Sequence, residues 1–112
     1  MYEYNKNHLE INGIEVNFEY DIRTIIHYRG KYVVLLAIPF DKEFINNVYC
    51  FDDYAELLWR SENLDSLYPN SHNLPYENMG IKDDIIFASD FYGRNYKINL
   101  NNGKIIDYDI VK

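Results

Sequence analysis

The chain has little of three features that would indicate a familiar class of protein: cysteine, clustered basic residues and long apolar runs. Cys50 is the only cysteine among 112 residues, so no internal disulfide can form, which is typical of a reducing compartment. The longest apolar run, from Tyr32 to Ile38, is far shorter than the roughly 20 residues that a membrane-spanning helix needs. Residues 1–13 show no basic region followed by an apolar core. We therefore expect a cytoplasmic protein that does not associate with membranes.

Basic residues are few and scattered. The sequence contains 11 Lys and Arg against 18 Asp and Glu, which gives a formal net charge of −7. Because no segment gathers Lys or Arg, the chain lacks the electrostatic footprint of a protein that binds a phosphate backbone, and we expect no nucleic-acid partner. An acidic surface would speed the encounter with a basic protein, so a protein partner is predicted to be basic.

The residue spacings of metal, cofactor and catalytic sites are also missing. His8, His27 and His72 lie far apart and no cysteine pair accompanies them, so we expect no zinc site. The acidic pair Asp52-Asp53 lacks the glycine and the distal glutamate of a calcium loop. Cys50 lies in the middle of an expected strand, where a buried, unreactive thiol is the usual state. We expect no catalytic residue, no metal and no cofactor.

Aromatic residues make up 17% of the chain, including 12 Tyr, and they favour strands. Residues 14–20, IEVNFEY, alternate strictly between apolar and polar side chains, which predicts a half-buried strand. Asn12-Gly13 connects this strand to residues 8–11, and this dipeptide is the strongest short signal for a hairpin. Hairpin one is therefore expected over residues 8–20.

Two more hairpins are expected in the next forty residues or so. Strands from Ile22 to Tyr28 and from Tyr32 to Ile38 flank the turn at Arg29-Gly30-Lys31. The second of these strands is apolar at every position, so both of its faces should be covered and it should lie centrally. Strands from Val48 to Phe51 and from Glu56 to Arg60 form hairpin three.

Residues 61–79 show neither helical nor strand periodicity, and we expect a long loop with one helical turn capped by Ser61. The C-terminal third should add three strands, over residues 84–90, 95–100 and 104–111. About nine short strands predict a single all-β domain over residues 1–112, an antiparallel meander of hairpins. The expected core residues are Leu35, Val34, Ile26, Phe18, Trp59, Phe87 and Ile98.

Residues 84–106, DIIFASDFYGRNYKINLNNGKII, resemble the repeat of PQQ-type (quinoprotein-like) β-propellers. The matching positions are Ser89-Asp90 and Gly93 in a first turn, Tyr96 to Asn99 in a strand, and Asn102-Gly103-Lys104 in a closing turn. Residues 46–59 resemble the same half-blade, with Asp52 at the acidic turn position and Trp59 at the usual tryptophan position. Ala55 departs from this pattern, because the repeat has glycine there.

The resemblance covers about a third of the chain, and a closed propeller needs at least four blades of about 40 residues each. It therefore implies blade-like geometry in the C-terminal half without closure, in which Trp59 packs against the C-terminal sheet. None of the family's cofactor or metal residues has a match here. The whole chain also resembles small uncharacterised bacterial proteins of similar length, which have no assigned activity.

Four aromatic residues outside the expected strand cores form the candidate binding surface: Tyr68, Tyr76, Phe91 and Tyr92. Tyrosine is enriched at recognition surfaces because it offers a large, rigid contact area. The leading hypothesis is a non-enzymatic domain that binds a protein through the loop 61–79 and the turn at Phe91-Tyr92. Two alternatives stay open: an immunity protein that neutralises a basic toxin, and a small ligand-binding or hydrolytic domain with an acidic site. An uncovered edge strand would also allow a dimer.

Overall fold

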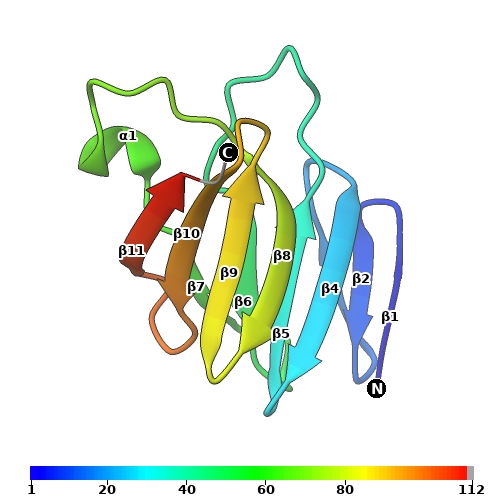
Figure 1. Cartoon of the computed structure of the whole chain (residues 1–112). Coiled ribbons are helices and arrows are strands. Elements are labelled where there is room, and N and C mark those ends of the chain that lie inside the picture. Colours follow the sequence, from blue (N-terminus) through cyan, green and yellow to red (C-terminus); the bar gives the residue numbers. More distant parts are fainter. Residues whose placement is uncertain (111–112) are drawn as a thin grey trace.

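The computed structural model describes residues 1–110, with side chains through residue 107, and this part of the chain is all-β (Figure 1). It contains one short helix, α1 (Leu64–Leu67). The strands form three antiparallel sheets, each built from consecutive strands, and none of the sheets closes into a barrel. The first sheet contains β1 (Tyr2–Asn5), β2 (His8–Ile11) and β3 (Ile14–Asn17). The second contains β4 (Ile22–Tyr28), β5 (Lys31–Leu36), β6 (Val48–Phe51) and β7 (Leu57–Arg60). The third contains β8 (Tyr76–Lys82), β9 (Ile85–Asp90), β10 (Arg94–Asn99) and β11 (Ile105–Ile110).

Tight two-residue turns fix the register of three hairpins. Both residues have positive φ at Asn12-Gly13, at Arg29-Gly30 and at Asp83-Asp84. Such turns follow the right-handed twist of the strands that they connect. The predicted hairpins over residues 8–20 and 22–38 are therefore confirmed in their pairing, with partners such as Ile11 opposite Ile14, although their second strands end earlier, at Asn17 and Leu36.

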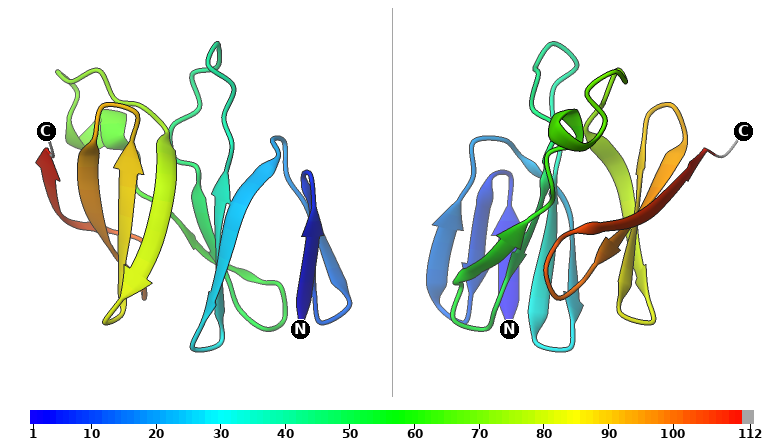
Figure 2. Two further views of the ribbon diagram at one scale, coloured as in Figure 1. Left: turned by 45° about the vertical axis from the view of Figure 1, so that its right-hand side comes forward. Right: turned by 90° about the vertical axis from the view of Figure 1, so that its left-hand side faces the viewer.

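The second sheet lies between the other two, and β5 provides the core on both of its faces (Figure 2). Val33 and Leu35 belong to the cluster shared with the third sheet, whereas Tyr32, Val34 and Leu36 belong to the cluster shared with the first sheet. Successive side chains of a strand point to opposite faces, so an uninterrupted apolar strand must be covered twice. The prediction of a central strand here is confirmed.

Trp59 of β7 joins the second sheet to the third. Its ring nitrogen Nε1 donates a hydrogen bond of 2.8 Å to the backbone oxygen of Leu100. The indole ring lies directly against Gly103, whose backbone has a φ of +74° in the β10–β11 turn. The expectation that this tryptophan packs against the C-terminal sheet is confirmed.

The faces at the two ends of the stack are mainly polar. In the first sheet, the side opposite the buried Leu9 and Ile11 carries only charged, histidine and asparagine side chains. In the third sheet, Phe87 is 38% exposed and lies opposite Gly80 of the neighbouring strand. The expectation that Phe87 belongs to the core is wrong, because its strand presents the alternate residues Ile86 and Ala88 to the interior.

The turns at Asp52 and Asp90 have the same hydrogen bonds, although they occupy different places in their sheets. One oxygen of Asp52 accepts hydrogen bonds from the backbone N–H groups two and four residues later, and one oxygen of Asp90 does the same. Ala55 has a φ of 60° where Gly93 has 80°, so the alanine adopts the left-handed conformation that glycine has in the other turn. The first turn joins the third and fourth strands of its sheet, whereas the second turn joins the second and third.

Other expectations need correction in the middle of the chain. The loop expected over residues 61–79 ends at residue 75, where β8 begins. Asn63 caps α1 in place of Ser61, because the Asn63 side chain accepts a hydrogen bond from the backbone of Asp65. Of the remaining expected core residues, Leu35, Val34, Trp59 and Ile98 are buried, whereas Ile26 and Phe18 are half-buried. No helix within residues 1–110 has the length and apolar character needed to cross a bilayer.

Candidate functional site

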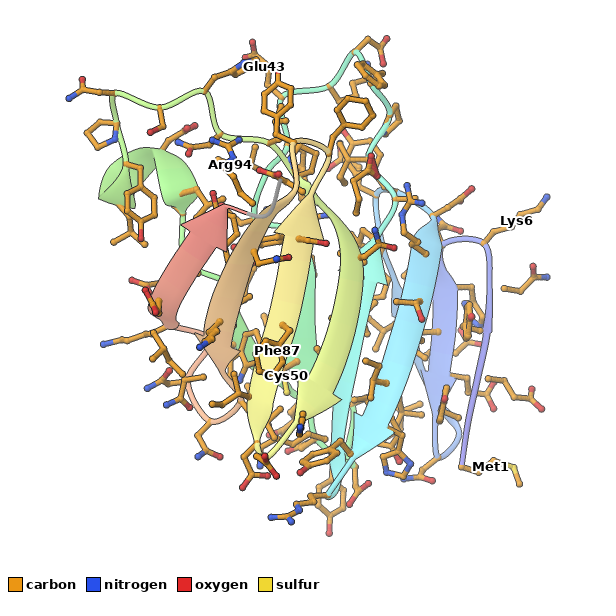
Figure 3. The ribbon with its side chains drawn as sticks, in the orientation of Figure 1. Met1, Lys6, Glu43, Cys50, Phe87 and Arg94 are labelled. Atoms are coloured by element: carbon orange, nitrogen blue, oxygen red, sulfur yellow. The ribbon has the colours of Figure 1, made fainter. Side chains whose placement is uncertain are left out.

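A groove of about 670 Å³ lies at one end of the molecule. Its walls come from three segments: residues 38–45 between β5 and β6, residues 71–77 leading into β8, and Phe91 with Tyr92 in the β9–β10 turn. Figure 3 shows Glu43 and Arg94 at this end, remote from Met1. The groove therefore lies where loops of the second and third sheets come together.

Asn47 holds the base of these loops in place. Its side-chain nitrogen donates hydrogen bonds to the backbone oxygens of Leu36 (2.8 Å) and Tyr76 (2.9 Å), and its side-chain oxygen accepts one from the Tyr76 backbone N–H (2.9 Å). The residue is completely buried. Three hydrogen bonds from one side chain thus connect β5 to the start of β8, and fix the two main walls of the groove relative to each other.

Asp90 and Arg94 hold the turn that carries Phe91 and Tyr92. The two side chains form an ion pair of 2.7 Å, with the Asp90 side chain fully buried and that of Arg94 13% exposed. The same arginine donates a hydrogen bond of 2.7 Å to the backbone oxygen of His72 in the opposite wall. A buried, hydrogen-bonded ion pair keeps a fixed geometry, so this edge of the groove is rigid.

Three aromatic side chains stand exposed along the groove: Phe40 is 92% exposed, Phe91 63% and Tyr92 58%. The Phe40 and Phe91 rings meet edge to face at 5.9 Å between centroids, and the Phe91 and Tyr92 rings are 6.1 Å apart. Arg94 lies over the Tyr92 ring at 5.5 Å. Soluble proteins bury most rings of this size, so three together at the surface form an apolar patch of the kind found at binding sites.

The charged residues that line the groove are mostly acidic. The groove is lined by four acidic residues and one lysine: Asp41, Glu43, Asp65, Glu77 and Lys42. Glu77 forms an ion pair of 3.1 Å with Arg23 of β4, and Asp65 accepts a hydrogen bond from Asn73. Among residues 1–107, no ion pair involves Asp41 or Glu43. The groove thus combines exposed rings with uncompensated negative charge.

The sequence placed only part of this site. Phe91 and Tyr92 line the groove as predicted surface residues, whereas Tyr68 is partly buried against the core. Tyr76 is 1% exposed and packs edge to face on Tyr96, so the expectation that it lies on the surface is wrong. Its ring fills the space between the second and third sheets, where burial of the large apolar ring stabilises the fold by more than burial of its one hydroxyl group costs.

Phe40 was missed by the sequence interpretation. It follows Pro39, which stops strand pairing, and it precedes charged residues, so the only signal was an aromatic residue in a polar connection. In the folded chain the Phe40 ring meets Phe91, so the residue 37–47 loop belongs to the site together with residues 71–77.

Burial shifts the pKa of several core groups. Desolvation raises the pKa of the Cys50 thiol to about 12, which keeps the sulfur protonated and unreactive at neutral pH. Desolvation also raises the pKa of Tyr76, and that of Tyr32, where a hydrogen bond to Asp53 adds to the effect. None of these side chains lines the groove.

One group of side chains in the described part of the chain could hold a metal ion. Ligand atoms of His8, Glu10 and Glu15 lie within 4.8 Å of one another on the outer face of the first sheet. His8 also hydrogen-bonds Asn17 through Nδ1 at 2.9 Å. The two-residue turn at Asn12-Gly13 places Glu10 opposite Glu15, so pairing the predicted strands would have revealed this group. All three side chains reach solvent, and the grouping alone does not identify a metal site.

Comparisons with known proteins give a family and a fold. A family model described as "Domain of unknown function (DUF7957)" matches residues 1–110. A search of curated proteins gave no match. Among solved structures, the crystal structure of the computationally designed Ika8 protein is similar, with a TM-score of 0.61 and 8% identity. That match covers 96% of this chain but 35% of the designed chain, and at such low identity it shows the fold alone.

Proposed function

The chain belongs to the DUF7957 family, and we propose that it is a non-enzymatic cytoplasmic domain that binds a basic protein partner through the groove. The observation that carries this proposal is the set of three exposed rings, Phe40, Phe91 and Tyr92, on two separate loops. Rings of this kind provide most of the binding energy in protein interfaces when they enter the desolvated centre of the contact.

The rigidity of the site supports the proposal. Asn47 anchors the base of the residue 37–47 loop, and the Asp90–Arg94 ion pair holds the turn that carries Phe91 and Tyr92 before any partner arrives. Association then costs less conformational entropy than it would with mobile loops. Scaffolds that hold aromatic side chains on loops in this way are common among recognition domains.

The charge of the groove supports a basic partner. Asp41 and Glu43 have no ion pair among the described residues, and the whole chain has a formal net charge of −7. Complementary charge accelerates encounter and rejects acidic proteins. The partner is therefore expected to present a segment with apolar and basic side chains.

Selection from a random peptide display library tests the proposal. The wild-type domain should enrich peptides that combine basic and apolar residues, and the variant Phe91→Ala should lose them. Tyr54→Ala is the matched control, because Tyr54 is 75% exposed and lies outside the groove. Failure of the wild-type domain to enrich peptides, or equal loss of binding in both variants, would refute a binding role for the groove.

A further inference from the structure

An unsatisfied acceptor lies in the wall of the groove. Asn73 lines the groove and is 8% exposed. Its side-chain nitrogen donates to Asp65 (2.8 Å) and to the backbone oxygen of Tyr68 (3.0 Å), so both of its N–H groups are used. Its side-chain oxygen is buried and has no hydrogen-bond partner within the described residues. A buried acceptor without a donor costs free energy, and a ligand that supplies an N–H group would recover this cost once a small movement of the wall uncovers the oxygen.

The two hydrogen bonds also fix the orientation of the amide. Because the nitrogen of Asn73 is held by Asp65 and Tyr68, the oxygen cannot exchange places with it without losing both bonds. The unpaired group is therefore an acceptor, and the ligand that fits it must be a donor. Asp41 and Glu43 on the facing segment are also acceptors only.

Arginine side chains already stack on aromatic rings elsewhere in this protein. Arg60 lies over the rings of Phe44 at 4.6 Å and Tyr49 at 5.1 Å. Arg94 covers Tyr92 in the groove itself, whereas Phe40 and Phe91 carry no arginine in the described part of the chain. A guanidinium ion stacks on such rings through its flat face and still presents its donors at the edge.

We infer that the groove binds an arginine side chain of the partner, seated against Phe40 and Phe91 with its donors directed to Asp41, Glu43 and Asn73. This inference rests on the proposed function and names the group that is recognised. The guanidinium fits because it has five N–H donors, no acceptor and a flat face. A lysine ammonium offers a point charge without that face, and a neutral donor leaves the two carboxylates unpaired.

The first test compares three peptides by nuclear magnetic resonance titration of the 15N-labelled domain. The probe is Ac-Gly-Leu-Arg-Leu-Arg-Gly-NH2, and the other two replace both arginines by citrulline or by lysine. Citrulline keeps the shape of arginine but removes its charge and two of its five N–H donors, and it places a carbonyl acceptor where one NH2 group was. We expect the arginine peptide to shift amide signals of residues 38–45, 71–77 and 91–92, the citrulline peptide to bind at least about tenfold more weakly, and the lysine peptide to fall between them.

The outcomes separate the two claims. Equal affinity for the arginine and citrulline peptides would overturn the arginine inference while the groove remained a peptide-binding site. Shifts confined to the opposite end of the molecule, or no shifts with any of the peptides, would refute the proposed function as well.

A pair of variants tests the acidic half of the site. D41N/E43Q removes two charges from the groove and should weaken binding of the arginine peptide by about tenfold while leaving that of the citrulline peptide nearly unchanged. E3Q/E56Q removes the same charge at exposed positions outside the groove and should change both affinities by less than about twofold. Equal effects of the two double variants would show that net charge, and not the groove, attracts the peptide.

Discussion

Replacing Gly103 by alanine should displace Trp59 and weaken the contact between the second and third sheets. A Cβ atom at Gly103 would lie 2.4 Å from Cε3, 2.6 Å from Cδ2 and 3.0 Å from Cγ of the indole ring. The ring cannot move away freely, because it is 7% exposed and donates its hydrogen bond to Leu100. One added methyl group therefore has to be accommodated by a large buried side chain.

The expected magnitude combines two effects. A non-glycine residue at the φ of +74° found here costs about 1 kcal/mol. Forcing a methyl group into a packed core costs roughly 1–3 kcal/mol more. The free energy of unfolding should therefore fall by about 2–4 kcal/mol, which is a large fraction of the roughly 5–15 kcal/mol typical of a small domain.

Gly13→Ala is the matched control. Gly13 has a φ of +85°, and a Cβ atom built there meets nothing within 4 Å, so this variant carries the backbone cost without the clash. It should lose about 1 kcal/mol. Urea denaturation followed by circular dichroism measures both variants, and the emission of Trp59, the only tryptophan, reports its displacement in the native state.

Equal losses in the two variants, or unchanged Trp59 emission in Gly103→Ala, would refute this reasoning. Either result would mean that the ring does not rest on Gly103 as described, and the connection between the second and third sheets would need another explanation.

Four further predictions concern groups described above. Burial raises the pKa of the Cys50 thiol from 9.0 to about 12, so between about pH 9 and pH 10 the unfolded state loses this proton while the folded state keeps it. The free energy of unfolding should therefore fall by up to about 1.4 kcal/mol per pH unit. Urea denaturation at both pH values should show a smaller fall for Cys50→Ala. Arg94→Met leaves the buried Asp90 carboxylate unpaired and should cost about 3 kcal/mol in urea denaturation, with much of the loss recovered when Asp90→Asn is added. Asn47→Ala removes three buried hydrogen bonds, one to Leu36 in the second sheet and two to Tyr76 in the third, and should cost about 2–4 kcal/mol in the same assay. Glu10→Gln relieves repulsion across the first sheet and should raise the melting temperature slightly at low salt, with no gain at high salt.

The sequence predicted hairpins well because their signals are local. Asn12-Gly13 tolerates positive φ at both residues, Gly30 does so in the second turn, and the uninterrupted apolar run of β5 required cover on both faces. Such features depend on a few neighbouring residues, so a single sequence contains them. The packing of Trp59 on the C-terminal sheet was predicted for a different reason, from a resemblance of residues 46–59 to part of a known repeat.

Neither β1 nor β8 was predicted, and β8 was missed because its periodicity is broken. The pairing register shifts between Tyr76 and Asn78, and Gly80 contributes no side chain, so apolar residues do not alternate along the strand. The wrong prediction that Tyr76 is exposed has the same cause, because a tyrosine assigned to a loop is expected to face solvent. Its place in the core depends on Tyr96, twenty residues away, which no local pattern reveals.

Half of the candidate site was likewise inaccessible to sequence reasoning. Phe91 and Tyr92 could be assigned to a turn, but Phe40 reaches Phe91 only because two loops from different sheets meet at one end of the molecule. The side-chain oxygen of Asn73 has no hydrogen-bond partner because the hydrogen bond of its amide nitrogen to Asp65 fixes the orientation of the amide. Contacts between loops are set by the packing of the sheets beneath them, and that packing is not encoded in any short stretch.

The central position of the second sheet has a consequence for the order of events during synthesis. Every strand pairs with a neighbour in sequence, so each sheet can assemble from local contacts, which favours rapid folding. The first sheet nevertheless leaves the ribosome with Leu9 and Ile11 unprotected, because their cover comes from β4, β5 and β6. The nascent chain therefore exposes this face until residue 51 has emerged, and a chaperone that holds residues 1–17 would protect it during that interval. The opposite face of the second sheet, with Val33 and Leu35, stays exposed until β8, β9 and β10 follow.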